Sequence, residues 1–286
     1  MTNRALTLTF LLFLLLSACT SPQFTGRIAF SSDRDGNAEI YIINADGTGL
    51  ERLTFSPTTD TSPAWSPDGQ HIAYNQEFEG NLDVCVMHTN GPATNLTGWP
   101  SAEGSPSWSP DGTRIAFASD GDGNLEIYSI AADGTDPLNL TNNPASDATP
   151  SWSPDGECTA FASDRHGTLD IYVLHLDTGT VDRLTTGAAA EVGPAWPPDS
   201  RRIAFSCAAD GDHEICFMNA DGTGLVRLTD NLVHDVDPSW SPDGPYLSFT
   251  HDPSQNADIY IISGDGLLLL PLTDHPATDF GASWAR

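Results

Sequence analysis

The sequence predicts an all-β protein folded as a six-bladed β-propeller, and three observations lead to that prediction. A tryptophan, followed in most copies by Ser-Pro-Asp-Gly, recurs at spacings of 43, 44, 44, 44 and 44 residues. Each interval holds short β-branched and aromatic segments between Gly-, Pro- and Asp-rich turns, without helical periodicity. Four such segments in a repeat of this length are typical of a propeller blade, which buries its faces by stacking against other blades. The repeated tryptophans are Trp65, Trp108, Trp152, Trp196, Trp240 and Trp284.

Each repeat is expected to form four antiparallel strands. The first strand ends in the tryptophan, as at 62–65, and a turn follows at 66–69, where proline presets φ and glycine supplies a left-handed conformation. A second strand of the type Ile-Ala-Phe comes next, as at 72–74, and a polar loop leads to a third strand, as at 83–86. A weak outer strand ends the repeat in Leu-Thr, as at 96–97.

The two ends of the repeated region predict how the ring closes. The chain enters the repeat at a second strand, 28–30, and its last strand is of the first type, ending at Trp284. Six copies of every strand exist only if this last strand completes the N-terminal blade. Such closure by main-chain hydrogen bonds removes the open sheet edge of a linear array. We therefore expect one propeller over residues 26–286.

The N-terminal residues predict an exported chain. Arg4 precedes an apolar stretch at 5–16, which is too short for a spanning helix and typical of a signal peptide. The segment Leu-Ser-Ala-Cys at 16–19 resembles the signal of bacterial lipoproteins. The resemblance implies cleavage after residue 18, lipid attachment to Cys19, a linker over 19–25, and a membrane-anchored protein on the periplasmic or cell-surface side. A plain signal peptide and an uncleaved anchor are the alternatives.

The net charge of the chain excludes some classes of binding partner. The formal net charge is -28, and all eleven basic residues are arginines, which argues against nucleic acid and against electrostatic adhesion to membranes. Acidic turns, genome composition or adaptation to salt would also produce this charge.

Cys207 and Cys216 fall on adjacent strands of one expected hairpin in blade 5, and the strand register decides whether they form a disulfide.

A carboxylate stands five residues before every repeated tryptophan, at the end of the loop that enters the first strand. Because these loops open on one face of a propeller, six carboxylates are expected around one mouth of the central channel. Oxygen ligands of this kind suit Ca²⁺ or Mg²⁺. The alternative is structural: each carboxylate accepts hydrogen bonds from a neighbouring blade and fixes the ring geometry. The six residues are Asp60, Glu103, Asp147, Glu191, Asp235 and Asp279.

The same loops differ most from blade to blade, which is where a binding surface would be encoded. Trp99 is singular, because no other repeat has an aromatic residue at this place. We expect it to act as an aromatic anchor beside the acidic ring. The alternative is that Trp99 packs against its own blade.

The repeated motifs resemble the TolB-type β-propeller family, with its WD-like repeats. Four full copies of Trp-Ser-Pro-Asp-Gly carry the resemblance, together with Ser-Asp-Arg-Asp-Gly-Asn at 32–37. The family's N-terminal α/β domain has no counterpart in this sequence. The resemblance implies a module of the cell envelope that binds a protein or peptide.

Three function classes follow from these expectations. The first is a monomeric, lipid-anchored propeller that binds an envelope protein or peptide at its channel mouth and needs no cofactor. The second is a receptor for a small ligand or cation. The third, a propeller lyase or hydrolase, is disfavoured: the sequence has no Gly-x-Ser-x-Gly or His-Glu-x-x-His motif, and its carboxylates are symmetric rather than differentiated as acid and base.

Overall fold

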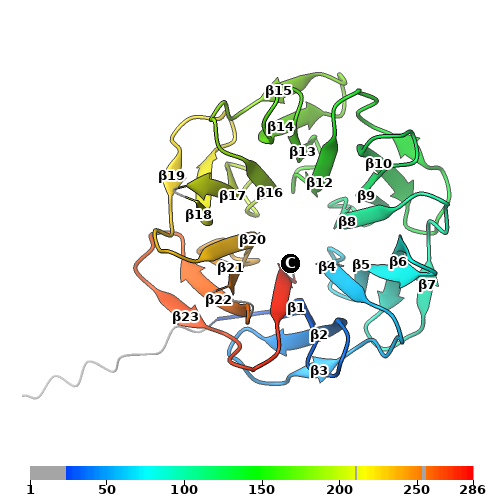
Figure 1. Cartoon of the computed structure of the whole chain (residues 1–286), viewed down its shortest axis with the longest axis vertical. Helices are drawn as coiled ribbons and strands as arrows, with labels where there is room; N and C mark the ends of the chain where they lie inside the picture. The colour runs from blue at the N-terminus through cyan, green and yellow to red at the C-terminus, as the bar shows by residue number, and fades with distance from the viewer. Residues whose placement is uncertain (1–23, 210, 253–255, 286) are drawn as a thin grey trace, which may run out of the picture.

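The computed structural model describes residues 24–209, 211–252 and 256–285. These residues form six four-stranded antiparallel sheets arranged around an axis, as Figure 1 shows in a view along that axis. The prediction of a six-bladed, all-β propeller is therefore confirmed. We number the blades 1 to 6, from the one that contains β1 (Arg27–Ser32) to the one that ends in β23 (Leu269–Pro271). Within the described residues no helix is long and apolar enough to cross a bilayer.

The strands at each of the four radial positions share a sequence type. The inner strands are β24 (Asp279–Trp284), β4 (Asp60–Trp65), β8 (Glu103–Trp108), β12 (Asp147–Trp152), β16 (Glu191–Ala195) and β20 (His234–Trp240). The second strands are β1 (Arg27–Ser32), β5 (His71–Phe78), β9 (Arg114–Ser119), β13 (Cys158–Ser163), β17 (Arg202–Ala209) and β21 (Tyr246–Asp252). The third strands are β2 (Glu39–Asn44), β6 (Asn81–His88), β10 (Glu126–Ala131), β14 (Asp170–His175), β18 (Asp212–Asn219) and β22 (Asp258–Ser263). The outer strands are β3 (Glu51–Arg52), β7 (Ala93–Asn95), β11 (Leu138–Asn139), β15 (Val181–Arg183), β19 (Val226–Arg227) and β23 (Leu269–Pro271).

Blade 1 closes the ring as the sequence predicted. Its strand order is β24-β1-β2-β3, and the last strand of the chain pairs with the first, with Ile28 opposite Trp284 and Ser32 opposite Asp279. Figure 1 shows the red C-terminal strand lying beside the blue N-terminal ones. The closure gives blade 1 the same four strands as the other blades and joins the two ends of the ring by main-chain hydrogen bonds.

The core lies between neighbouring blades. Each blade presents one large aromatic residue from its second strand and the tryptophan that ends its inner strand, and all of these are buried. The indole Nε1 of Trp108 donates a hydrogen bond to the carbonyl oxygen of Ala64 in blade 2 at 3.1 Å, and Trp240 bonds Ala195 of blade 5 at 3.1 Å. With Trp196, three of the six tryptophans are thus both packing residues and polar links to the previous blade. The indole nitrogens of Trp65 and Trp152 have no hydrogen-bond partner, and that of Trp284 bonds the Thr25 carbonyl.

The Ser-Pro-Asp-Gly turn is held by its own side chains. The Ser66 hydroxyl accepts a hydrogen bond from the His71 amide at 2.9 Å, and the Asp68 carboxylate accepts one from the Gln70 amide at 2.9 Å. Gly69 lies at a φ of 65°, a conformation that costs glycine little. Serine, aspartate and glycine therefore each stabilise the turn at their own position of the motif, although blade 5 forms it with Pro197 and Ser200 in place of the serine and the glycine.

Candidate functional site

The six carboxylates that begin the inner strands are buried inside the blades, and the expectation that they line the channel mouth is wrong. Their exposed fractions range from 0% for Asp60 to 7% for Glu191. The reason is the pleat of the inner strand: Asp147 pairs with Ser163 of the second strand, and its side chain stays at that level of the blade. A β-bulge two residues later turns a different side chain toward the axis.

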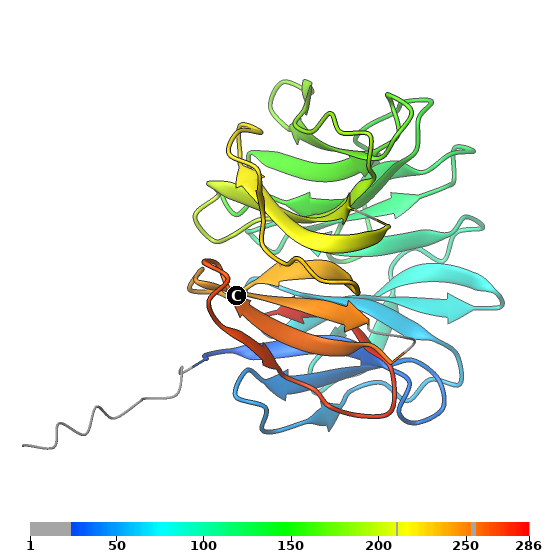
Figure 2. The ribbon, with the colours of Figure 1, turned by 60° about the vertical axis from the view of Figure 1, so that its left-hand side comes forward.

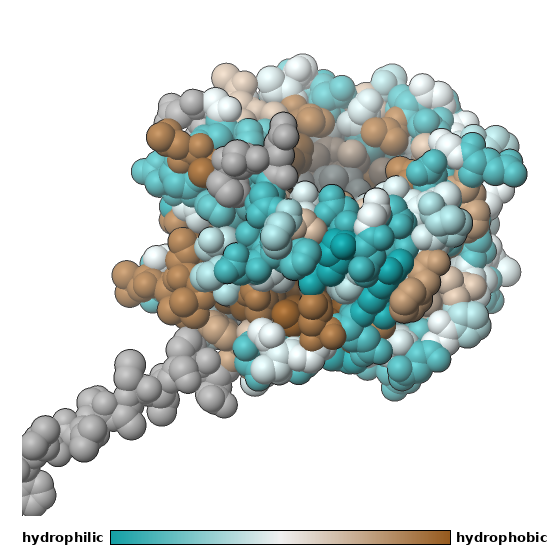
Figure 3. Space-filling model, turned by 60° about the horizontal axis from the view of Figure 1, so that its bottom comes forward, coloured by the Kyte–Doolittle hydropathy of each residue, from teal (hydrophilic) through white to brown (hydrophobic). Residues whose placement is uncertain are grey.

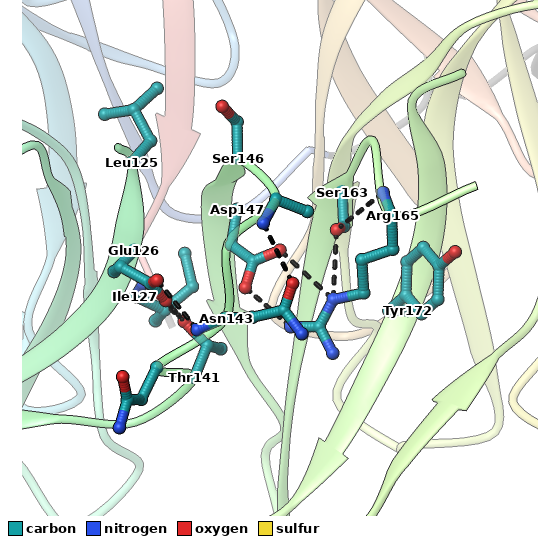
Figure 4. Close-up of polar contacts among 12 residues, drawn as sticks. Leu125, Glu126, Ile127, Thr141, Asn143, Ser146, Asp147, Ser163, Arg165 and Tyr172 are labelled. Atoms are coloured by element: carbon teal, nitrogen blue, oxygen red, sulfur yellow. Dashed lines mark hydrogen bonds and ion pairs between the residues drawn. The ribbon is translucent and has the colours of Figure 1, made fainter. Parts of the chain in front are cut away.

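Two of these carboxylates are paired with arginines. Asp147 meets the Arg165 guanidinium at 2.6 Å, and Asp279 receives two hydrogen bonds from Arg34, both at 2.8 Å. Figure 4 shows the Asp147–Arg165 pair beside Ser163. In blade 6 the His251 ring takes the place of arginine and lies 2.6 Å from Asp235. These contacts give the carboxylates a structural role, but each lies within one blade and does not come from a neighbouring blade as the structural alternative expected.

The other three carboxylates lack a cationic partner. Glu103 is held by the hydroxyls of Ser101 and Ser119, at 2.5 and 3.0 Å, and burial raises its pKa. Burial also raises the pKa of Glu191. Neither oxygen of Asp60 has a hydrogen-bond partner, and burial raises the pKa of this group to about 7. The six positions therefore include both carboxylates that contact a basic side chain and carboxylates whose pKa is raised by burial.

A second set of six carboxylates, which the sequence analysis missed, lies at or near the start of the third strands. In blade 5 the Thr229 hydroxyl accepts a hydrogen bond from the Ile215 amide at 2.9 Å and donates one to Glu214 at 2.5 Å. Figure 4 shows the matching contact between Thr141 and Glu126 in blade 3. The recurrent Leu-Thr of the outer strand was the available signal, because a threonine repeated at every blade implies a repeated hydrogen bond. The six residues are Glu39, Asp83, Glu126, Asp170, Glu214 and Asp258.

The axis of the ring is occupied by two small cavities of about 200 and 190 Å³. The first lies at the end of the inner strands, among the repeated tryptophans and small residues. The second, which we call the axial mouth, lies nearer their beginning and includes Phe280. Six of its lining residues stand two positions after each buried carboxylate, with left-handed φ between 50° and 64°. These six are Ser62, Ser105, Thr149, Gly193, Asp237 and Gly281.

Asp237 is the single charged residue among those that line the two axial cavities. Asp237 is exposed, and it lines the axial mouth. Its amide donates a hydrogen bond to the Ser206 hydroxyl of blade 5 at 3.2 Å, which helps to hold the left-handed backbone. The sequence signal was an acid at a position that is Ser, Thr or Gly in the other blades. This single carboxylate makes one side of the axial mouth suited to bind a cationic group.

Trp99 does not line the axial cavities. It is half-buried, and its ring lies 5.7 Å from that of Phe117 and 6.0 Å from that of Tyr128, between ring centroids. Arg165 stacks over the equivalent rings of blade 4, but blade 3 has Gly121 in place of that arginine. Trp99 therefore fills the space of a missing arginine, and its placement at the channel mouth is corrected.

The remaining predicted residues are the cysteines and the metal ligands. Cys207 and Cys216 form a disulfide across β17 and β18, with 5.9 Å between their Cα atoms. Cys19 and the signal peptide lie outside the described residues. Among the residues that the structure describes, no three His, Cys, Asp or Glu side chains gather closely enough to hold a metal ion. The six carboxylates expected to share Ca²⁺ or Mg²⁺ are thus not brought together.

Comparison with known proteins gives the chain a family. The family model described as TolB beta propeller domain matches residues 16–103, 94–194 and 188–285. A Tol-Pal system protein TolB of Desulfosudis oleivorans is 43% identical over 65 residues, which are 23% of this chain and 15% of that protein. The crystal structure of TolB from Acinetobacter baumannii superposes with a TM-score of 0.83 at 26% identity, over 92% of this chain and 67% of that one.

A putative TolB from Agrobacterium tumefaciens shares the fold, with a TM-score of 0.75 at 23% identity over 92% of this chain and 99% of that one. The segment matched in the Desulfosudis protein is a small part of its length, so the activity of the whole relative does not transfer with the match. The three matches of the family model together cover nearly all of the described residues. The chain belongs to the TolB β-propeller domain family.

Proposed function

We propose that this chain is an exported, lipid-anchored propeller of the cell envelope that binds a protein or peptide segment at its axial mouth. The observation that carries the proposal is the asymmetry of that mouth. One side holds the carboxylate of Asp237 beside Phe280, and the other holds the hydroxyls of Ser62, Ser105 and Thr149. A lysine, an arginine or a terminal amine of a partner would meet the carboxylate, while its apolar neighbour packs on the phenyl ring.

Relatives and sequence support the cellular context of this proposal. The relative from Desulfosudis oleivorans is named a Tol-Pal system protein, and the Cys207–Cys216 disulfide suits an oxidising compartment outside the cytoplasm. Lipid on Cys19 would supply the anchor. The six buried carboxylates are given a structural role, because none of them lines the axial cavities, two are neutralised by arginine and one faces histidine.

No catalytic step is part of the proposal. Acid–base catalysis by carboxylates needs two groups whose environments hold them in different protonation states. The residues that line the axial cavities include one ionisable carboxylate, Asp237. Recognition of a charged segment requires only that single group.

Photo-crosslinking tests the binding site. Benzoylphenylalanine replaces Phe280 in the full chain, and in a control it replaces Leu138, which is 54% exposed on the outer edge of blade 3. After irradiation of intact cells we expect a discrete protein adduct from position 280, weakened several-fold by Asp237→Asn, and none from position 138. Equal adducts from both positions, or none from position 280, would contradict the proposal. Mass spectrometry of the mature chain, with Cys19→Ser as the control, tests the anchor separately.

A further inference from the structure

The outer edge of blade 6 is unusually apolar. Leu267, Leu268, Leu269 and Leu270 follow one another at the turn between β22 and β23, and we call this segment the leucine edge. Leu267 is 88% exposed, Leu269 is 51% exposed and Leu270 is 38% exposed. Figure 3 shows apolar side chains gathered on this edge of the molecule.

The position equivalent to Leu270 is polar in three of the other five blades and a single apolar residue, Leu138 or Val226, in blades 3 and 5. Leu270 pairs with Ile261, and the equivalent pairs place Glu51 in blade 1 and Asp182 in blade 4. No packing requirement of the propeller explains four successive leucines, because three of the other outer strands form with a polar residue at the position of Leu270. A run of exposed leucines on an otherwise acidic protein marks a surface that contacts something apolar.

The leucine edge lies next to the point where the described chain begins. The Phe24 ring packs edge-on against Tyr246 of blade 6, with 5.0 Å between centroids. Tyr246 pairs with Ser263, whose amide donates a hydrogen bond to the Leu268 carbonyl at 3.0 Å. Tyr246, which Phe24 contacts, is therefore two strand spacings of ~5 Å from the leucine edge. Figure 2 shows the N-terminal end of the described chain on the same side as the β22–β23 turn.

The short segment between Cys19 and Phe24 favours a lipid bilayer as the apolar surface that the leucine edge contacts. Five residue steps separate Cys19 from Phe24, and a fully extended chain of that length spans at most about 18 Å. A lipid on Cys19 would thus hold the base of blade 6 against a bilayer. We propose that the leucine edge inserts into the outer layer of that bilayer and fixes the orientation of the propeller; this inference rests on the proposed lipid anchor.

The charges around the leucine edge fit insertion rather than electrostatic adhesion. Residues 266–271 contain no ionisable side chain, and the adjacent Asp265 uses its carboxylate to accept the Leu267 amide at 3.1 Å. Because the whole chain has a net charge of -28, attraction to anionic lipid headgroups would not hold it. Contact through leucine side chains would depend little on salt.

Insertion at this edge also orients the proposed binding site. The β22–β23 turn lies at the level of Trp240, where the inner strands end, because Tyr246 pairs with Ser263 and Leu247 pairs with Trp240. The axial mouth lies toward the opposite end of the inner strands. A propeller resting on its leucine edge therefore presents Asp237 away from the membrane, where a partner can reach it.

Depth-dependent quenching tests the proposal. The full lipidated chain is reconstituted in phosphatidylcholine vesicles with brominated acyl chains, and a fluorescent amino acid replaces Leu270. The matched control carries the label at Leu138, the equivalent outer-strand position of blade 3 on the far side of the ring. We expect at least twofold quenching at position 270, little at position 138, and loss of the quenching at 270 after Leu267→Glu.

Equal quenching at the two positions on vesicle-bound protein would overturn the proposal. So would shielding at position 270 that appears only at high protein density, since it would identify a second copy as the partner. If mass spectrometry finds no lipid on Cys19, the proposed anchor fails. The same labelled chains are then held by an N-terminal hexahistidine tag on nickel-chelating lipids, so that the leucine edge is still tested by itself.

Discussion

Blades 2 and 4 place the same residue type at the same point of the fold and give it opposite surroundings. Asp60 of blade 2 and Asp147 of blade 4 both begin an inner strand and are fully buried. Asp147 is neutralised by Arg165, two residues beyond its cross-strand partner, whereas blade 2 has Phe78 at that place. The Thr54 hydroxyl of blade 1 is directed to Glu39 and leaves Asp60 without a hydrogen bond. A repeated position therefore does not fix a charge state; the neighbouring side chains do.

Removing the cation from blade 4 is expected to have the largest effect. Arg165→Met keeps an apolar contact over Phe161 but leaves the Asp147 carboxylate buried without its partner. Breaking a buried ion pair from one side costs about 3–5 kcal/mol. Urea unfolding at pH 8 measures the change in the free energy of unfolding. The control is Arg114→Met, whose partner Asp136 is 79% exposed, with an expected cost below about 1 kcal/mol. Similar losses in the two variants would show that the burial of the pair does not matter.

The second prediction is that a substitution in blade 2, Asp60→Asn, stabilises the protein, whereas Arg165→Met in blade 4 destabilises it. Because the folded-state pKa of Asp60 is about 7 against an ordinary value of 3.8, the folded chain binds more protons than the unfolded chain between these values. The contribution of Asp60 to stability therefore falls as pH rises from about 4 to 7 and is constant above that window. Asp60→Asn should match the parent near pH 4 and be more stable at pH 8, by at most about 4 kcal/mol. Thermal unfolding of both proteins across this range measures the difference. A difference that does not grow with pH would mean that Asp60 is ionised in the folded chain at no cost.

The contrast between the blades also shows which features a sequence can predict. Trp65 and its five equivalents predicted the number of blades, because a repeated buried residue has the same neighbours in every copy. Ring closure followed from the strand type at Trp284. These inferences depend on the repeat alone.

The candidate site depended on departures from the repeat. The sequence placed the loops before the inner strands correctly, and the carboxylates were therefore expected at the mouth. The bulge after Asp235 instead directs Asp237 toward the axis. A bulge changes which residue faces which side without changing the pattern of residue types. Whether Asp60 meets a cation depends on Phe78, more than fifteen residues away in the chain, and no local pattern reveals that contact.

The third prediction concerns a brace made from a hydroxyl instead of a cation. Thr229→Val in blade 5 removes the acceptor of the Ile215 amide and the donor to Glu214, and both partners are fully buried. Leaving buried polar groups unsatisfied costs about 1–3 kcal/mol. Chemical unfolding should show that loss without a change in the slope against denaturant, because the surface exposed on unfolding is unchanged. Thr229→Ser, which keeps the hydroxyl, is the control and should recover most of the lost stability. A valine variant as stable as the parent would show that Arg227 and the Asn231 amide, 3.0 and 2.7 Å from Glu214, satisfy this carboxylate, and that the Ile215 amide loses its acceptor at no cost.

The smallest expected change in stability comes from replacing Thr159, whose buried hydroxyl makes no hydrogen bond. Thr159 of blade 4 is fully buried, and its Oγ1 has no hydrogen-bond partner, whereas the equivalent residue of blade 3 is Ile115. Thr159→Val replaces a buried unsatisfied hydroxyl with a methyl group of nearly the same size, so stability should rise by about 1 kcal/mol. For a chain of this size such a gain raises the melting temperature by about 2 °C, which calorimetry resolves. Because Thr229 and Thr159 are both buried threonines, opposite signs for the same substitution would show that the recurrent hydrogen bond, rather than the residue type, stabilises the blade. A loss at both positions would instead show that Thr159 is satisfied by bound water.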